Sequence, residues 1–401
     1  MAKTNQNILA NIVVIGGGTG SFTLLSGLKE YASNITALVN MSDDGGSSGK
    51  LRDELGVLPP GDIRQCLVAL AQAPQLRDLF DYRFEEGGLS GHSFGNLFIS
   101  AVEKMTKSFD DAINLASKVL RVQGRVLPIT TDKSHLVLYD KTGTRTQGEF
   151  KIGNMDFGAV RRPKIVLEPA SKITDVAKQA ILTADIVVIA PGNLYGSLAP
   201  ALIVDGVGEA LNKTKAKIVY VCNLVTKPNQ TDDFSVEDYV SEIERFIGWP
   251  VLDWVIYNTD EPTETMLRKY TKDGEFMVEF DLAKLRKAHY RAIGLPLIDT
   301  EPLKHGKADA ISSARSLIRH DPDVIAREIV KISKLDLRKT PSPPGRIISP
   351  ACLAGTAGRA VNGFSSLDVS TDTSPSDKTV FARTNSPQER TILRKSSKYN
   401  E

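Results

Sequence analysis

Two short apolar runs in this chain each end in a glycine-rich loop that leads directly into an amphipathic stretch. Ile12–Ile15 is followed by Gly16-Gly17-Gly18-Thr19-Gly20-Ser21, and Ile186–Ala190 is followed by Pro191-Gly192-Asn193-Leu194-Tyr195-Gly196-Ser197. A strand, a glycine loop and a helix in this order are typical of parallel sheets covered by helices on both faces. The pattern predicts an α/β fold with both loops at the carboxyl ends of strands, around one crevice.

The chain up to about Ser333 has the alternating pattern of a doubly wound, mostly parallel sheet related to the Rossmann fold. Predicted buried strands are Ile12–Ile15, Ile35–Val39, Ile186–Ala190, Ile218–Cys222 and Val251–Tyr257. Predicted helices are Phe22–Tyr31, Asp62–Ala71, Asp110–Leu120, Thr174–Thr183, Ala199–Leu211, Val236–Phe246 and Asp321–Ile332. A β-hairpin inserted on the sheet is predicted from His135–Asp140, Lys141-Thr142-Gly143 and Thr144–Phe150.

The last part of the chain differs in composition from the rest. Residues 336–401 are rich in Ser, Thr and Pro and hold 10 Lys/Arg against 6 Asp/Glu, so the net charge of +2 comes from this segment. We expect a disordered tail, either a phosphorylatable regulatory segment or a solvated linker. The predicted organisation is an N-terminal extension over 1–10, one domain over 11–335 and the tail over 336–401. The nearly neutral domain is not expected to bind nucleic acid.

Several classes of protein are disfavoured by what the sequence lacks. Cys66, Cys222 and Cys352 are too far apart for a zinc motif or a disulfide framework, so core thiols are expected. The five histidines include no HExxH pair. Because no apolar run approaches the ~18 residues of a membrane span and the N-terminus lacks the features of a signal peptide, a cytoplasmic protein is expected.

The loop after the first predicted strand has the composition of a phosphate-binding loop. Glycine allows close approach of the backbone to a phosphate, and the free N–H groups of the following helix start attract anions. We therefore expect contacts from Gly17, Gly18, Thr19, Gly20 and Ser21. Ser21 stands where the dinucleotide fingerprint ends in glycine, and no GK[ST] follows, which disfavours a nicotinamide oxidoreductase and a P-loop ATPase. Tight packing of helix on strand is the alternative explanation of the glycines.

Asp43 and Asp44 follow the second predicted strand, in the segment NMSDDGGSSGKLR. An acidic residue after this strand is placed to bind a ribose hydroxyl, and adjacent carboxylates can also hold Mg²⁺. We interpret Gly45–Gly49 as a loop and Asp43 and Asp44 as candidate ribose, metal or catalytic residues. A solvated surface turn is the alternative.

Two further polar groups precede helices. In Pro59-Pro60-Gly61-Asp62-Ile63-Arg64, Asp62 is expected to cap a helix, and Arg64 in the first turn opposes the helix dipole, which suggests an anionic partner such as a diphosphate. In Gly91-His92-Ser93-Phe94-Gly95-Asn96, His92 is a candidate proton carrier or phosphate donor, with a structural role equally open.

Six segments, taken in order, resemble one known family. They are GGGTGSF, SDDGGSSGKLRDELGVLPPGDIRQCLVAL, GHSFGN, LASKVLRVQGRVLP, APGNLYGS and VYVCN, and the family is that of the bacterial gluconeogenesis factors (YvcK/CofD-like, UPF0052), relatives of 2-phospho-L-lactate transferase. The resemblance spans Ile12 to Ile332, and the long second segment is far more specific than a glycine loop alone. It implies a CofD-like, Rossmann-related fold.

The resemblance also implies a function. It suggests a regulatory protein that binds a UDP-sugar such as UDP-N-acetylglucosamine, acts on a partner enzyme and links carbon metabolism to cell-wall precursor supply and cell shape. A homo-oligomer is expected. The alternative is a Mg²⁺-dependent transferase that moves a phospholactyl group from a nucleotide diphosphate donor to a deazaflavin. Late contacts to the UDP-sugar are implied for Tyr270 and Arg319. The expected ligand-binding residues are Gly17, Gly18, Thr19, Gly20, Ser21, Asp43, Asp44, Arg64, His92, Asn96, Gly192, Asn193, Tyr195, Ser197, Tyr270 and Arg319.

Overall fold

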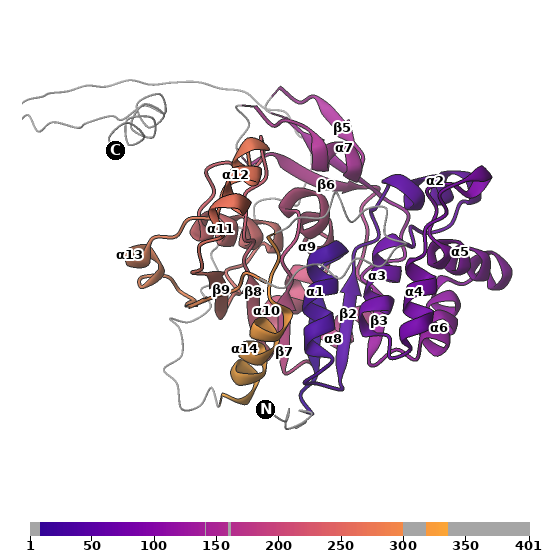
Figure 1. The fold of residues 1–401 in the computed structure, drawn as a ribbon, viewed down its shortest axis with the longest axis horizontal. Helices are drawn as coiled ribbons and strands as arrows, with labels where there is room; N and C mark the ends of the chain where they lie inside the picture. The colour runs from indigo at the N-terminus through magenta and orange to yellow at the C-terminus, as the bar shows by residue number, and fades with distance from the viewer. Residues whose placement is uncertain (1–8, 141, 159–161, 300–317, 336–401) are drawn as a thin grey trace, which may run out of the picture. The chain divides into compact units, whose positions relative to one another are not determined.

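Seven parallel strands form the central sheet in the part of the chain that the computed structural model describes, residues 9–140, 142–158, 162–299 and 318–335. The strand order is β10-β9-β8-β7-β1-β2-β3, as Figure 1 shows in part. The bounds are β1 Ile12–Ile15, β2 Ile35–Val39, β3 Arg125–Pro128, β7 Ile186–Ile189, β8 Lys217–Val221, β9 Trp254–Asn258 and β10 Arg291–Leu295. All five predicted strands are present, two with the predicted bounds and three within three residues of them, and β3 and β10 were not predicted.

The chain changes direction across the sheet between β1 and β7. It runs outward from β1 through β2 to β3, and β7 then returns to the other side of β1, with Ile12 opposite Ile186 and Ile15 opposite Ile189. Both glycine-rich loops therefore leave the same edge of the sheet from neighbouring strands. This arrangement is the topological switch point at which open α/β sheets bind ligands.

The strands are buried on both faces by helices. Side chains alternate across β1, so that Ile12 and Val14 pack in one core and Val13 and Ile15 in the other. The first core includes α1 Gly18–Leu28, α3 Gly61–Leu70, α5 Phe94–Thr106, α6 Phe109–Leu120 and α14 Pro322–Lys334. The second includes α8 Asp175–Leu182, α9 Ala199–Leu202, α10 Val207–Lys213 and α11 Val236–Ile247. The predicted doubly wound architecture is confirmed.

The predicted hairpin belongs to a second, antiparallel sheet. β4 His135–Tyr139 pairs with β5 Arg145–Gln147 and with β6 Lys164–Glu168. The expectation that its second strand continues to Phe150 was wrong, because helix α7 Glu149–Asn154 begins there. Asp44 explains this start, since its carboxylate accepts hydrogen bonds from the N–H groups of Glu149 at 3.1 Å and Phe150 at 2.7 Å.

Three helix predictions need correction. The stretch Ala199–Leu211 is two helices, because the chain turns between them through Gly206 with a φ of 91°. The Gly/Ser run interpreted as a loop instead begins α2, Gly46–Leu55. The first helix starts at Gly18 and ends at Leu28, earlier than predicted at both ends. The remaining helices are α4 Pro74–Asp81, α12 Glu264–Lys272, α13 Leu282–Leu285, the 3₁₀ turn Gly87–Leu89 and the π-helical turn η2 Leu194–Leu198.

The chain divides after Ser349 into two units, and every described residue belongs to the first. The predicted tail over 336–401 and Cys352 lie outside the described residues, and the domain boundaries stay predictions. Cys66 and Cys222 are buried free thiols, as expected. No helix among the described residues is long and apolar enough to cross a membrane.

Candidate functional site

The two glycine-rich loops touch each other through their backbones. A Cβ atom built on Gly20 would lie 1.9 Å from the carbonyl oxygen of Pro191, a distance that no side chain tolerates. Gly20 therefore allows the start of α1 to approach the loop after β7. The contact agrees with the prediction that both loops lie at one edge of the sheet, although the sequence did not predict that their backbones touch.

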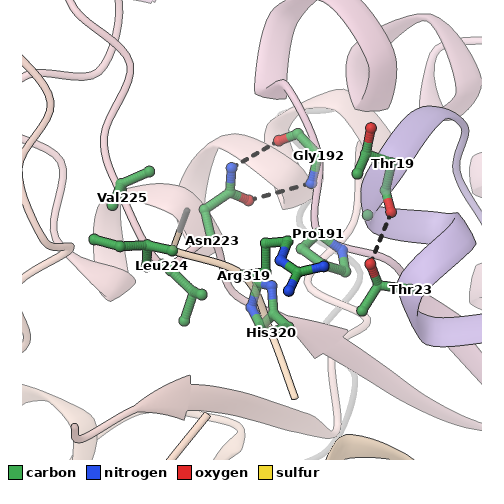
Figure 2. Close-up of a pocket in the computed structure, with 11 residues that line it drawn as sticks. Thr19, Thr23, Pro191, Gly192, Asn223, Leu224, Val225, Arg319 and His320 are labelled. Carbon is green, nitrogen blue, oxygen red and sulfur yellow. Dashed lines mark hydrogen bonds between the residues drawn. The ribbon is translucent and has the colours of Figure 1, made fainter. Parts of the chain in front are cut away.

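A cavity of about 150 Å³ opens beside this contact, at the carboxyl ends of β1, β7 and β8 (Figure 2). Its wall combines both glycine loops with the residues that follow β8 and those that precede α14. The lining residues are Thr19, Gly20, Thr23, Pro191, Gly192, Asn223, Leu224, Val225, Ile318, Arg319 and His320. Four of the predicted ligand-binding residues, namely Thr19, Gly20, Gly192 and Arg319, thus line one cavity.

Asn223 is a lining residue that was not predicted individually. Its Nδ2 donates to the carbonyl oxygen of Gly192 at 2.7 Å, and its Oδ1 accepts from the N–H of Gly192 at 3.4 Å, as the dashed lines in Figure 2 show. The side chain therefore fixes the loop after β7 from the neighbouring strand. The signal was available, because Asn223 ends the segment VYVCN directly after an apolar run.

Arg319 supplies the permanent positive charge among the described lining residues. Its Nη2 lies 3.1 Å from Oδ2 of Asp299 in a partly buried ion pair. Tyr270 does not line the cavity. Its buried hydroxyl accepts a hydrogen bond from the N–H of Ile318 at 2.8 Å, so it positions the segment that carries Arg319. Asp321 caps α14 through the N–H groups of Asp323 and Val324, as predicted.

The start of α1 is bonded to a carboxylate of the chain itself. The N–H of Gly18 donates to Oδ1 of Asp62 at 3.0 Å, and a Cβ on Gly17 would lie 2.0 Å from Oδ2. The expectation that Asp62 caps α3 was wrong, because that helix has no side-chain cap. A phosphate at Gly17 and Gly18 stays a prediction, and it would have to displace or share this contact.

Three carboxyl groups gather next to this contact. Burial and the nearby Asp43 raise the pKa of Asp62 to about 7, and the same two causes raise the pKa of Glu149 to about 9. Burial also raises the pKa of Asp43, although its Oδ1 accepts from the N–H of Gly45 at 2.9 Å. Lys227 partly offsets the effect at Glu149. Glu149 was not predicted, because it follows a hairpin far from any glycine motif.

Asp44 has a different structural role from Asp43, because it caps a helix. Both of its carboxylate oxygens accept backbone N–H groups at the start of α7. Within the described residues, no group of three or more His, Cys, Asp or Glu side chains is arranged to hold a metal ion. The assignment of Asp43 and Asp44 to Mg²⁺ stays a prediction.

Arg64, His92 and Asn96 form a buried polar network away from the cavity lining. Nε of Arg64 donates to Oδ1 of Asn96 at 3.1 Å, and its guanidinium pairs with Asp81 at the end of α4. The hydroxyl of Ser47 lies 2.9 Å from Nδ1 of His92 and accepts from Nδ2 of Asn96 at 3.1 Å. Arg64, for which the sequence suggested an external anion, therefore pairs with an anion of the chain itself. Ligand contact and catalysis by these residues stay predictions.

The remaining predicted residues belong to the two loops but lie outside the cavity lining. Asn193 caps the turn η2, since its Oδ1 accepts from the N–H groups of Tyr195 at 3.3 Å and Gly196 at 3.1 Å. The ring of Tyr195 is fully buried in the second core. Ser21 is also buried, and a Cβ on Gly16 would lie 2.6 Å from its Oγ. Asn193, Tyr195, Ser197 and Ser21 do not line the cavity.

Comparison with known proteins points in one direction. The model of the family described as "2-phospho-L-lactate transferase CofD" matches residues 12–298. A "putative gluconeogenesis factor" of Thermotoga maritima is 41% identical over 330 residues, covering 80% of this chain and 99% of the relative. The "gluconeogenesis factor" of Bacillus subtilis is 36% identical over 329 residues, covering 80% and 98%. A crystal structure of a UPF0052 family member from Bacillus halodurans has a TM-score of 0.72 at 36% identity, covering 80% and 99%.

Proposed function

The chain belongs to the 2-phospho-L-lactate transferase CofD family, alongside relatives named gluconeogenesis factors, and from this premise we propose that it is a regulatory protein that binds a UDP-sugar. The observation that carries the proposal is the cavity at the switch point between β1 and β7, where Thr19, Gly20, Gly192 and Arg319 meet. Ligands of open α/β sheets bind at this position.

The chemistry of the wall suits a nucleoside diphosphate. The guanidinium of Arg319 has several N–H donors in a planar arrangement that matches phosphate oxygens. The N–H groups of Thr19 and Gly20 and the hydroxyl of Thr19 lie at the start of α1, where anions are attracted. Leu224, Val225 and Ile318 give the wall an apolar part against which a nucleoside can pack. Asn223 and Tyr270 hold the two sides of the wall in place by hydrogen bonds to Gly192 and Ile318.

The regulatory part of the proposal concerns what the bound ligand does. Occupancy by a UDP-sugar of the UDP-N-acetylglucosamine type would connect the loops after β1, β7 and β8 with the segment before α14. A partner enzyme that binds this surface would then change its activity with the concentration of the cell-wall precursor. Such a link between carbon metabolism and cell shape is the role we propose, in a homo-oligomeric protein.

The carboxyl groups beside the start of α1 favour a second candidate, a Mg²⁺-dependent transferase that uses a nucleotide diphosphate donor. Burial raises the pKa of both Asp43 and Asp62, with added repulsion from Asp44 at Asp43 and from Asp43 at Asp62, so a divalent cation would stabilise the ionised pair. Asp44 contributes less, because its oxygens cap α7. A bound Mg²⁺ would neutralise part of the charge on the donor's diphosphate bridge and on the nucleoside monophosphate that leaves when the phospholactyl group is transferred.

A ligand panel separates the two candidates. Thermal unfolding with UDP-N-acetylglucosamine, UDP-glucose, NAD and a GDP-linked donor should give a stabilisation that grows with concentration for the UDP-sugar. The regulatory proposal expects this stabilisation without Mg²⁺ and no product with a deazaflavin acceptor. Product formation that requires Mg²⁺ would establish the transferase instead, and stabilisation by NAD alone would contradict both.

A further inference from the structure

His320 is a buried histidine in the cavity wall that no sequence motif singled out. It directly follows Arg319 and is 9% exposed. Its backbone pairs with Ile298 in an antiparallel bridge, and its ring reaches the end of β8, where Nε2 lies 2.9 Å from the carbonyl oxygen of Cys222. The backbone bridge to Ile298 and the ring contact to Cys222 therefore fix His320 at the edge of the cavity.

This contact determines which ring nitrogen carries the hydrogen. A peptide carbonyl only accepts hydrogen bonds, so Nε2 of His320 must be the donor to Cys222. In the neutral ring, Nδ1 then has a lone pair and no hydrogen. Nδ1 has no hydrogen-bond partner within the described part of the chain. Burial also lowers the pKa of His320 to about 4, which keeps the ring neutral at physiological pH.

The cavity wall thus places two chemically different groups side by side. Arg319 has donors only and suits an anion, whereas Nδ1 of His320 is an acceptor and repels one. A bare phosphate satisfies the first group and leaves the second unpaired. A nucleotide can satisfy both, because it carries N–H or O–H groups on its base and ribose in addition to its phosphates.

We propose that His320 determines specificity at this site by accepting a hydrogen bond at Nδ1 from an N–H or O–H group of the bound nucleotide. The inference rests on the proposed nucleotide-sugar site and adds to it a residue and a ligand chemistry. This acceptor would favour binding of nucleotides over pyrophosphate. It would also favour nucleotides that present an N–H or O–H donor near Nδ1 of His320 over those that do not.

Two substitutions of His320 test the roles of its two ring nitrogens separately. His320→Gln places an amide N–H near the position of Nε2, keeping the bond to Cys222, and removes the acceptor. His320→Asn places an amide oxygen near the position of Nδ1 and removes the bond to Cys222. We expect H320Q to keep the melting temperature of the empty protein and to lose affinity for UDP-N-acetylglucosamine about tenfold. H320N should lose stability but keep more of the affinity than H320Q does.

Calorimetric titration of the full-length wild-type and variant proteins gives the test. The probes are UDP-N-acetylglucosamine, UDP, 3-methyluridine diphosphate, 2′-deoxyuridine diphosphate and inorganic pyrophosphate. H320Q should weaken UDP binding and leave pyrophosphate binding unchanged. If the donor is the uracil imide, wild type and H320Q should bind the 3-methyl analogue equally; if it is the ribose hydroxyl, they should bind the deoxy analogue equally.

The outcomes separate this inference from the proposed function. If wild type binds UDP-N-acetylglucosamine and H320Q binds it equally well, the role assigned to His320 is wrong and the proposed function stands. Affinity that follows melting temperature, with H320N weaker than H320Q, would make His320 purely structural. If wild type binds none of the nucleotides, the proposed function fails and the inference fails with it.

Discussion

The side-chain amide of Asn223 bonds to both backbone polar groups of Gly192: Nδ2 donates to the carbonyl oxygen at 2.7 Å, and Oδ1 accepts from the N–H at 3.4 Å. Gly192 belongs to the loop after β7, and Asn223 follows the next strand in the sheet. Because both residues line the cavity, this pair joins two parts of its wall. Binding of a ligand between the loops should therefore depend on a residue with a mainly positioning role.

Replacing Asn223 tests this role. Asn223→Ala removes both hydrogen bonds and should weaken UDP-N-acetylglucosamine binding about tenfold. Asn223→Asp cannot donate to Gly192 while ionised and adds a negative charge beside the ligand, but its protonated form can donate again. Relative to wild type, binding by N223D should thus be weakest at pH 8 and recover toward pH 5, whereas the alanine variant should show no recovery. The exposed Asn34, changed to Ala, is the control. If N223A and N223D show the same pH profile of binding, the hydrogen bond from Asn223 to the carbonyl oxygen of Gly192 does not contribute to binding.

The contact between Gly20 and Pro191 gives a second prediction. Gly20 lies inside α1, where alanine is normally preferred to glycine by ~1 kcal/mol. Here a Cβ would overlap the carbonyl oxygen of Pro191, so Gly20→Ala should destabilise the protein by roughly 1–3 kcal/mol and reduce nucleotide binding. Gly88→Ala is the matched control, since nothing lies within 4 Å of its Cβ position. Chemical denaturation and ligand titration measure the two effects, and a G20A protein as stable as G88A would contradict the close contact.

Arg319 should matter for binding more than for folding. Arg319→Ala removes the guanidinium from the cavity and should weaken UDP-sugar binding about 30-fold, the effect expected for hydrogen bonds to a charged group. Loss of its partly buried ion pair with Asp299 should destabilise the empty protein by only about 1 kcal/mol or less. Arg327, which pairs with Asp323 on the surface of α14, serves as the control for loss of an arginine. A large drop in the melting temperature of empty R319A would show that Arg319 is structural.

The sequence predicted the sheet well because its strands are apolar runs bounded by glycines. The same rule located Thr19, Gly20 and Gly192, since a loop after a parallel strand must lie at the carboxyl edge of the sheet. It did not give the direction of each side chain within a loop. Asn193 and Tyr195 share the loop of Gly192, but the π-helical turn directs one to cap the backbone and the other into the core.

Contacts between distant segments account for what the sequence could not predict. Arg64 was interpreted as needing an external anion, yet its partner Asp81 is 17 residues away on another helix. Asp62 was assigned to its own helix, yet it bonds to Gly18 on α1, 44 residues away. Neither pairing has a local spacing that periodicity can reveal. Glu149 meets Asp43 and Asp62 only because the second sheet packs α7 against the loop after β2.

The raised pKa of Asp62 predicts a pH-dependent stability. Its pKa is about 7 in the folded protein against 3.8 for an unperturbed aspartate, so the folded state binds more protons between these values. The contribution of this group to stability is full below about pH 4 and is lost as the pH rises through 7. Asp62→Asn stays neutral and can still accept from Gly18, so its free energy of unfolding relative to wild type should increase by about 1–2 kcal/mol between pH 5 and pH 8.

Denaturant titrations of both proteins at several pH values measure this difference, which cancels groups that titrate equally in both, including His320. Repeating them with Mg²⁺ and no nucleotide connects the result to the proposed transferase. A cation bound by Asp43 and Asp62 would lower the pKa of Asp62 and flatten the wild-type profile, and it would leave D62N much less affected. A constant difference between the proteins from pH 5 to 8 would mean that solvent screens Asp62. In that case the carboxyl groups beside α1 would exert no mutual repulsion for a cation to relieve.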